Sequence, residues 1–504
     1  MITVKKLKNE WGRQYGWKSV LWFFLHFAIL VVLCAVLLLW DKLGNLGAYM
    51  ETHAANYLYA LFCGFLLILI LYCYFLFENK EILQSGKMIT LVFSVLDLYI
   101  VISYLLGAYL QIYARPIAFV ALMIFVLIGR KEAIFLNVMS ALLMFVIDTF
   151  TIDSLGAKEC YSSLIISFSA GMFAIFFCEK AKTRFRVVGI GILIVFPIDL
   201  VILILELSTL IEPNGNIIGE MPMFEGIITK MGYGLFGGVM STVFFLTILP
   251  IFEGVFNCLT VFRLRELTSS DAQLLKRLKE EAIGTYNHSV TVSQLAEACA
   301  AAIGEDVDYA RAAALYHDVG KLHYPEHFTE NQGDYNLHDE LTPELSADII
   351  RSHAKDGYTL IHNSHLPNFL ADVALQHHGT MPIRYFYAKA LKLTDGELNI
   401  EDFSYLGPKP QTKIAAIVMI ADAAEATVRA LSSRSPEAVE KAIRSVIEER
   451  MDLEQFAECE ITMVDLTKIR LALVTTLTGV YHHRIKYPNI KYKKSEDGST
   501  KGEA

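Results

Sequence analysis

Eight long apolar stretches fill the first half of the chain and constrain its fold more than any other feature. They lie at 19–40, 56–77, 88–107, 109–128, 133–150, 161–178, 187–208 and 234–257. A helix needs about 20 apolar residues to cross the hydrocarbon core of a bilayer, and the fifth and sixth stretches are slightly short of this. Runs at this density leave no polar face for water. We therefore predict a membrane domain over residues 1–257 with about eight transmembrane helices.

Lysine and arginine in the segments around these runs alternate between rich and poor. The rich segments hold Lys5, Lys6, Lys8, Arg13 and Lys18; Lys80 and Lys87; Arg130 and Lys131; Lys180, Lys182, Arg184 and Arg186; and Arg263 and Arg265. The poor segments hold one each, namely Lys42, Arg115, Lys158 and Lys230. Because positive loops stay inside, this pattern predicts a cytoplasmic N-terminus and a cytoplasmic second half. We expect the first run to be an uncleaved anchor, since no cleavage site follows it.

Four acidic residues lie inside the apolar runs: Asp97, Asp148, Asp199 and Glu206. Acids within a membrane are costly and often functional. Asp199 is a candidate for ligand binding or proton transfer, on a helix that Pro197 is expected to kink. Asp148 and Glu206 are equally well explained by positions near the membrane interface.

The composition changes near residue 258, after which the chain is charged and rich in histidine. We predict an amphipathic connector at 258–283, an all-helical domain at 284–487 and a disordered tail at 488–504. Helices are expected to begin near 288, 308, 343, 367 and 412, with Gly320 and Gly379 at helix ends. The fold class is therefore all-α throughout. The formal net charge of −9 argues against DNA or RNA as a partner.

Histidine and aspartate recur along the predicted helices of the second half. They are His288, the pair His317–Asp318, His353, the pair His377–His378, and Asp422. Five imidazoles and two carboxylates suit two divalent transition-metal ions, and a carboxylate such as Asp318 can bridge them. Two ions about 3.5–4 Å apart clamp an attacking hydroxide and a phosphoryl oxygen. Lys321, one turn past Asp318, is placed to neutralise charge on a phosphate.

The remaining histidines carry weaker expectations. His323 and His338 are candidates for supporting positions behind the metal ligands. Surface positions are expected for His362, His365, His482 and His483.

The motif His…His-Asp…His…His-His…Asp resembles the HD superfamily of metal-dependent phosphohydrolases. The stretches Gly-Thr-Tyr-Asn-His-Ser at 284–289, Tyr-His-Asp-Val-Gly-Lys-Leu at 316–322, Glu-Asn-Gln at 330–332 and His-His-Gly-Thr at 377–380 are similar to the seven-transmembrane HD family, PgpH type. Leu-Pro-Ile-Phe-Glu at 249–253 resembles that family as well.

The resemblance implies an enzyme that hydrolyses cyclic di-AMP to pApA with two metal ions, iron or manganese, in a bacterial cell membrane. His288, His317, Asp318 and Asp422 would hold one ion. Asp318, His353, His377 and His378 would hold the other. Asp318 and Lys321 would be catalytic, and Lys321, Thr380 and Tyr385 would contact the substrate. A homo-oligomer is compatible with this interpretation.

Two departures from the family pattern are visible. Members usually carry a large extracellular domain between the first two membrane helices, whereas only 41–55 stand there in this chain. Ile283 and His323 replace the proline and the basic residue that are common at those places. Three alternatives stay open: an HD hydrolase of another nucleotide or phosphoester, a dinucleotide receptor without catalysis, and a transporter. The transporter is disfavoured because no internal repeat is evident.

Overall fold

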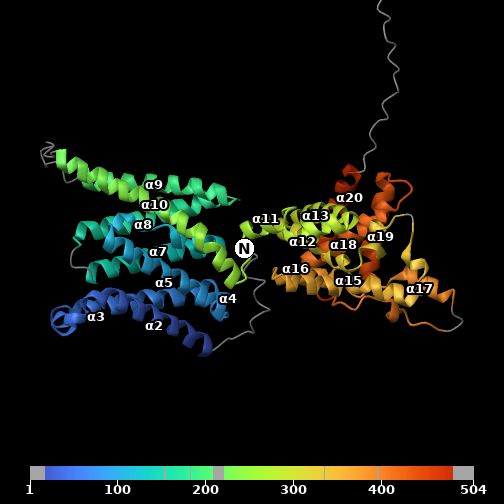
Figure 1. The fold of residues 1–504 in the computed structure, drawn as a ribbon, viewed down its shortest axis with the longest axis horizontal. Coiled ribbons are helices and arrows are strands. Elements are labelled where there is room, and N and C mark those ends of the chain that lie inside the picture. The colour runs from blue at the N-terminus through green and yellow to red at the C-terminus, as the bar shows by residue number, and fades with distance from the viewer. Residues whose placement is uncertain are drawn as a thin grey trace, which may run out of the picture. The chain divides into compact units, whose positions relative to one another are not determined.

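The protein is described by a computed structural model that covers residues 17–151, 155–181, 183–207, 221–333, 335–393 and 397–480. The predicted tail at 488–504 and the two histidines at 482 and 483 lie outside these residues. The chain divides into two compact units, Met1–Ser269 and Ser270–Ala504 (Figure 1). The described residues form helices and no named strand, which confirms the all-helical fold class.

The membrane unit begins with a hairpin of two long helices. Its elements are α2 (Trp17–Leu39), η1 (Trp40–Asn45), α3 (Leu46–Glu78), α4 (Lys80–Leu83), α5 (Gly86–Tyr109), η2 (Ile112–Ala114), α6 (Phe119–Leu127), α7 (Arg130–Thr151), α8 (Ala157–Cys178), α9 (Arg184–Leu207), α10 (Met221–Val255) and α11 (Val261–Leu267). Six described helical stretches are long and apolar enough to span a bilayer, and the first of them, Trp17–Glu78, contains both arms of the hairpin. The chain is therefore a membrane protein.

The apolar run at 109–128 does not form one spanning helix, contrary to the prediction. The helix α5 ends at Tyr109, and α6 has only 9 residues, which is about 14 Å at 1.5 Å per residue. The break follows from Pro116, because proline lacks an amide donor and disfavours helical geometry at the residue before it. Residues Phe119 to Ile124 are buried, so α6 forms the core of the bundle.

Arg115, which the loop pattern treated as exposed, is buried against Asp148 of α7. Its Nη1 lies 2.6 Å from Asp148 Oδ2, and its Nη2 lies 2.9 Å from Oδ1. A Cβ on Gly107 would stand 2.7 Å from Arg115 Nε, so a glycine there leaves room for the guanidinium group. The irregular segment is also fixed by Ser241 of α10, whose hydroxyl accepts a hydrogen bond from the Ala118 amide.

The other acids of the membrane unit differ in their partners. Glu206 lies 3.2 Å from Lys158 Nζ and 3.1 Å from Lys230 Nζ. Asp199 has a buried Oδ1 with no hydrogen-bond partner among the described residues, and its candidate role stays a prediction. Of the three lysines that stood alone in poor segments, Lys158 and Lys230 are therefore both paired with Glu206.

The amphipathic connector predicted at 258–283 contains two separate helices. The first part, α11, belongs to the membrane unit, where Arg184 lies 3.0 Å from Glu253 and 2.7 Å from Glu266. The second part, α12 (Gln273–Glu281), belongs to the other unit. Ser269 and Ser270, at the division, lie between the two helices.

The second unit is a bundle in which α13 (Ile283–Ile303) packs against α14 (Val307–Tyr316), α18 (Lys413–Arg429) and α20 (Met463–Val480). The other elements are η3 (Val319–His323), η4 (Pro325–His327), η5 (Thr329–Asn331), η6 (Leu337–Asp339), α15 (Pro343–Asn363), α16 (Asn368–Gln376), α17 (Arg384–Leu391), η7 (Ile400–Phe403) and α19 (Pro436–Asp452). The residues Ile414–Ala421 are all buried, so α18 is central. The predicted metal ligand Asp422 is the next residue of this helix.

Local signals set the helix ends near the site. Thr342 caps α15 by accepting a hydrogen bond from the Leu345 amide, and Pro343 takes the first turn as predicted. Gly379 follows α16 with a positive φ of 53°, a left-handed conformation that favours glycine. Gly320, expected at a helix end, instead lies inside η3, where a side chain would collide with the backbone of His353. That close approach holds η3 against α15.

We predict that Arg115→Met destabilises the protein by about 3–5 kcal/mol, because it leaves Asp148 buried without its partner. The free energy of unfolding of the purified chain in detergent micelles measures this. The double variant Arg115→Met with Asp148→Leu should recover most of the loss, since both buried charges are then removed. A single variant as stable as the parent protein would contradict the assigned importance of the ion pair.

Candidate metal centre

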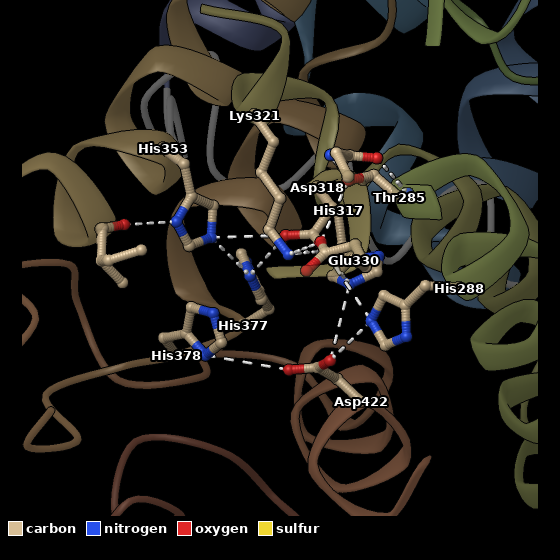
Figure 2. A network of polar contacts seen from close by, with 12 residues as sticks. Thr285, His288, His317, Asp318, Lys321, Glu330, His353, His377, His378 and Asp422 are labelled. Carbon is tan, nitrogen blue, oxygen red and sulfur yellow. Dashed lines mark hydrogen bonds and ion pairs between the residues drawn. The ribbon is translucent and has the colours of Figure 1, made fainter. Parts of the chain in front are cut away.

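Seven predicted ligands from five separate segments meet at one place in the second unit (Figure 2). His288 lies on α13 and Asp422 lies on α18, while His317 and Asp318 follow α14. The other three come from α15 and from the end of α16: His353, His377 and His378. Most of these side chains are buried, whereas those of His378 and Asp422 are partly exposed.

Six of the seven predicted ligands, all but Asp422, form two groups that share one carboxylate. The donor atoms of each group lie within 4.8 Å of one another, and Asp318 belongs to both. Its Oδ2 lies 3.3 Å from His317 Nε2 and 3.7 Å from His288 Nε2. Its Oδ1 lies 3.3 Å from His353 Nε2 and 3.7 Å from His377 Nε2. One oxygen of Asp318 therefore faces each group.

Three histidines are oriented by their own helices. The Nδ1 atoms of His317, His353 and His377 lie within hydrogen-bond distance of the backbone carbonyl three residues earlier. A carbonyl only accepts, so Nδ1 carries the proton and Nε2 is left as the ligand atom. The helical position of each residue thus sets the tautomer that a metal requires.

His288 is held between two carboxylates. Its Nε2 lies 2.9 Å from Asp422 Oδ1, and its Nδ1 lies 2.8 Å from Glu425 Oε2. Asp422 Oδ2 is also 3.8 Å from His378 Nδ1. One oxygen of Asp422 therefore faces His288 of the first group, and the other faces His378 of the second group.

Lys321 is fixed by two acids at the edge of the cluster. Its Nζ lies 2.8 Å from Asp318 Oδ2 and donates to Glu330 Oε1 at 2.7 Å. Thr285 also donates to Glu330 Oε1, at 3.0 Å, and Asn331 donates to the hydroxyl of Thr285 at 2.8 Å. Lys321 therefore cannot move freely, and its charge stays beside the shared carboxylate.

The buried charges set a sharp contrast in acidity across the cluster. Burial alone would lower the pKa of His317, but the charge of Asp318 and hydrogen bonds to Asp318 and Asp422 raise it to about 10. Burial, only partly opposed by Asp318, lowers the pKa of His353 to about 3. Burial opposes ionisation of Asp318, yet His317 and Lys321 hold its pKa well below the usual value. The protein alone therefore keeps Asp318 ionised.

Four other predicted site residues, Thr380, Tyr385, His323 and His338, differ in exposure and in their partners. Thr380 is tied to Gln455, which accepts from its amide at 3.0 Å and donates to its hydroxyl at 2.9 Å. Tyr385 is 66% exposed and meets Phe386 edge-on. His323 is exposed, while His338 is buried and bonds the carbonyl of His327.

Sequence reasoning assigned no role to three residues beside the ligands. Glu330 lay in a quoted motif, but nothing in the motif pairs it with Lys321. Glu425 stands one helical turn after Asp422, a spacing that places both on one face and that provided a usable signal. Tyr405 stacks its ring on His378 with centroids 4.2 Å apart, and it comes from a loop without any pattern.

A helical membrane unit followed by a helical unit with clustered histidines and aspartates defines a class, the polytopic membrane proteins with an HD-type domain. Residues 54–260 match the family described as 7TM receptor with intracellular HD hydrolase, and 285–427 match the HD domain family. The chain belongs to the seven-transmembrane HD family. An HD domain implies binding of divalent metal, and the cluster offers the donor atoms for it.

Named relatives agree with this membership. The cyclic-di-AMP phosphodiesterase PgpH of Bacillus subtilis is 36% identical over 425 residues, which are 83% of this chain and 57% of that protein. The PgpH of Listeria monocytogenes is 43% identical over 265 residues, 52% of this chain and 37% of that protein. The chain thus spans little more than half the length of the first relative and a smaller share of the second.

Two crystal structures of the Listeria monocytogenes PgpH HD domain are also similar. One is 44% identical, with a TM-score of 0.40, and covers 42% of this chain and 100% of its own. The other, a complex with cyclic-di-AMP, is 46% identical with a TM-score of 0.41 and covers 42% and 99%.

We predict that metal binding to this cluster releases protons and weakens as the solution becomes more acidic. The reason is the raised pKa of His317, which holds a proton at neutral pH that a metal ion must displace. The apparent affinity for Mn²⁺ should fall by about tenfold per pH unit for each proton released. Calorimetry in buffers of different ionisation enthalpy counts those protons. A Mn²⁺ affinity that does not change between pH 8 and pH 6 would contradict the assignment of a proton to His317.

Proposed function

We propose that the protein is a membrane-bound, metal-dependent phosphodiesterase that hydrolyses cyclic di-AMP to pApA. The observation that carries this proposal is the meeting of all seven predicted ligands: six of them form two groups that share Asp318, and Asp422 lies 2.9 Å from His288. The names of the two PgpH relatives, which the chain matches over much of its length, support the choice of substrate. Its adenine selectivity rests on that likeness alone.

Two divalent transition-metal ions, iron or manganese, fit the residues of the cluster. Imidazole and carboxylate together favour such ions over magnesium or calcium. His317 Nε2 and Asp318 Oδ1 are buried, and each faces another candidate donor atom of the cluster at 3.3 Å, as expected of atoms that face a cation. When bound, such a pair supplies positive charge for phosphate oxygens and activates water at neutral pH.

The chain's own residues would then position and balance the reacting groups. His288, His317 and Asp422 would hold the first ion, His353, His377 and His378 the second, and Asp318 both. Lys321 stays protonated, because although burial disfavours its charge, Asp318 and Glu330 raise its pKa. It would place a fixed positive charge beside the shared carboxylate as negative charge builds up on the phosphate.

The proposed substrate contacts Thr380 and Tyr385 are both exposed. Thr380 follows the pair His377–His378, and its bonds to Gln455 fix the turn that presents them. Tyr385 is exposed enough to meet a base. Tyr405 adds an aromatic surface beside His378. We retain Thr380 and Tyr385 as proposed contacts and add Tyr405.

We also propose that residues 1–257 anchor the enzyme and that 258–283 connect them to a cytoplasmic HD domain at 284–487. The pairing of Lys158 and Lys230 with Glu206 supports this orientation, since it neutralises positive charge on the side expected to be outside. The burial of Arg115 removes one more charge from the expected outer loops.

The decisive assay incubates the full chain in detergent with Mn²⁺ and cyclic di-AMP and follows the products by chromatography. We expect pApA to form. His353→Ala should reduce its formation to the level seen without protein, because one group loses a ligand. The matched control is His362→Ala, which changes an exposed histidine of the same helix and should leave the rate unchanged. Retained hydrolysis in His353→Ala would refute the site.

Cyclic di-AMP that binds without turnover would favour a receptor, and turnover of other phosphoesters alone would favour a hydrolase of a different substrate. Either result would overturn the proposed reaction while leaving the family membership in place.

Reporter fusions between α8 and α9 and after residue 504 test the orientation. Both should report cytoplasm, because the segment around Arg184 and Arg186 is among the most basic in the membrane unit. A fusion between α2 and α3 should report the opposite side. Agreement between that fusion and the first two would contradict the proposed topology.

A further inference from the structure

Glu425 is a buried acid that touches a metal ligand without belonging to either ligand group. Only 3% of the residue is exposed, and its Oε2 lies 2.8 Å from His288 Nδ1. We propose that Glu425 is a positioning residue that makes the His288 group the tighter of two unequal metal sites. This inference rests on the metal centre of the proposed function.

The contact is unusual among the ligands of this cluster. His317, His353 and His377 each present Nδ1 to a neutral backbone carbonyl of their own helix. His288 presents Nδ1 to a carboxylate on another helix, 137 positions away in the sequence. A carboxylate behind an imidazole fixes its tautomer and raises its basicity toward a metal more than a neutral acceptor does.

The surrounding charges point the same way. The His288 group combines two imidazoles with Asp318, and Asp422 Oδ1 lies only 2.9 Å from His288 Nε2. The other group combines three imidazoles with the same Asp318, and Asp422 Oδ2 approaches it no closer than 3.8 Å at His378. Glu425 adds a further acid on the first side only. Lys321 brings a positive charge to this side, 2.8 Å from Asp318 Oδ2, but Glu330 lies 2.7 Å from it and balances that charge. With Asp422 and Glu425 on the same side, a divalent cation is attracted more strongly to the His288 group.

Glu425 is itself held in place. Its Oε1 lies 3.7 Å from Arg429 Nη1, one turn further along α18, while Oε2 meets His288. The chain Arg429–Glu425–His288 runs from a partly exposed guanidinium group to the buried ligand. Arg429, Glu425 and His288 also line a pocket of about 490 Å³.

The test uses the full chain in detergent, stripped of metal with a chelator and titrated with Mn²⁺ while free Mn²⁺ is followed by electron paramagnetic resonance. The parent protein should bind two ions in two phases. Glu425→Gln keeps the size and a hydrogen-bond acceptor but removes the charge. Its tighter phase should weaken by about 10–100-fold, and its weaker phase should remain. Glu425→Asp, which restores the charge, should recover part of the loss.

The matched control is Glu297→Gln, the same change at a partly buried acid of the helix that carries His288, where it pairs with Arg311 rather than with a site residue. It should retain both phases. A Glu425→Gln titration that superimposes on the parent curve, or one in which both phases weaken equally, would overturn the inference. Thermal unfolding identifies a misfolded variant, in which case the Glu425→Asp titration decides. The titration contains no nucleotide, so failure of the proposed reaction would leave its result intact.

Discussion

The second unit depends on the compensation of one buried charge, the ionised side chain of Asp318. A buried carboxylate is costly unless charges and hydrogen bonds compensate it. Here Lys321 stands 2.8 Å from one oxygen, and histidines from four segments surround both. The helices that carry these groups must all reach the same point for the carboxylate to be tolerated. Site and fold are therefore stabilised by the same contacts, including the approach of η3 to α15 that Gly320 permits.

The seven predicted ligands could be picked out from the sequence, whereas the residues that hold them in place could not. The predicted ligands stand in motifs whose residue types and order suit metal binding. Glu330 and Tyr405 act through neighbours that chain folding brings to them, and no periodicity encodes such contacts. Glu425 is an intermediate case, because its place one turn after Asp422 marks a shared helix face. Its partner His288, however, lies 137 positions away in the sequence, on α13.

In the membrane unit, too, the sequence predicts some features and not others. Hydropathy predicts where helices form, because each apolar run must bury its backbone polar groups by hydrogen bonding internally. It fails at 109–128, where Arg115 and Pro116 interrupt the run. Hydropathy averages one arginine into its apolar surroundings, while the structure assigns it a single partner, Asp148. The irregular backbone is tolerated there because neighbouring helices enclose it.

The Arg115–Asp148 pair has a consequence for the order in which the membrane unit can assemble. Arg115 precedes Asp148 by 33 residues in the chain, so during synthesis the arginine leaves the ribosome well before its partner exists. An unpaired guanidinium group is poorly tolerated in lipid. Stable burial of the segment after α5 therefore requires α7, and we expect α6 and α7 to take their places in the bundle together.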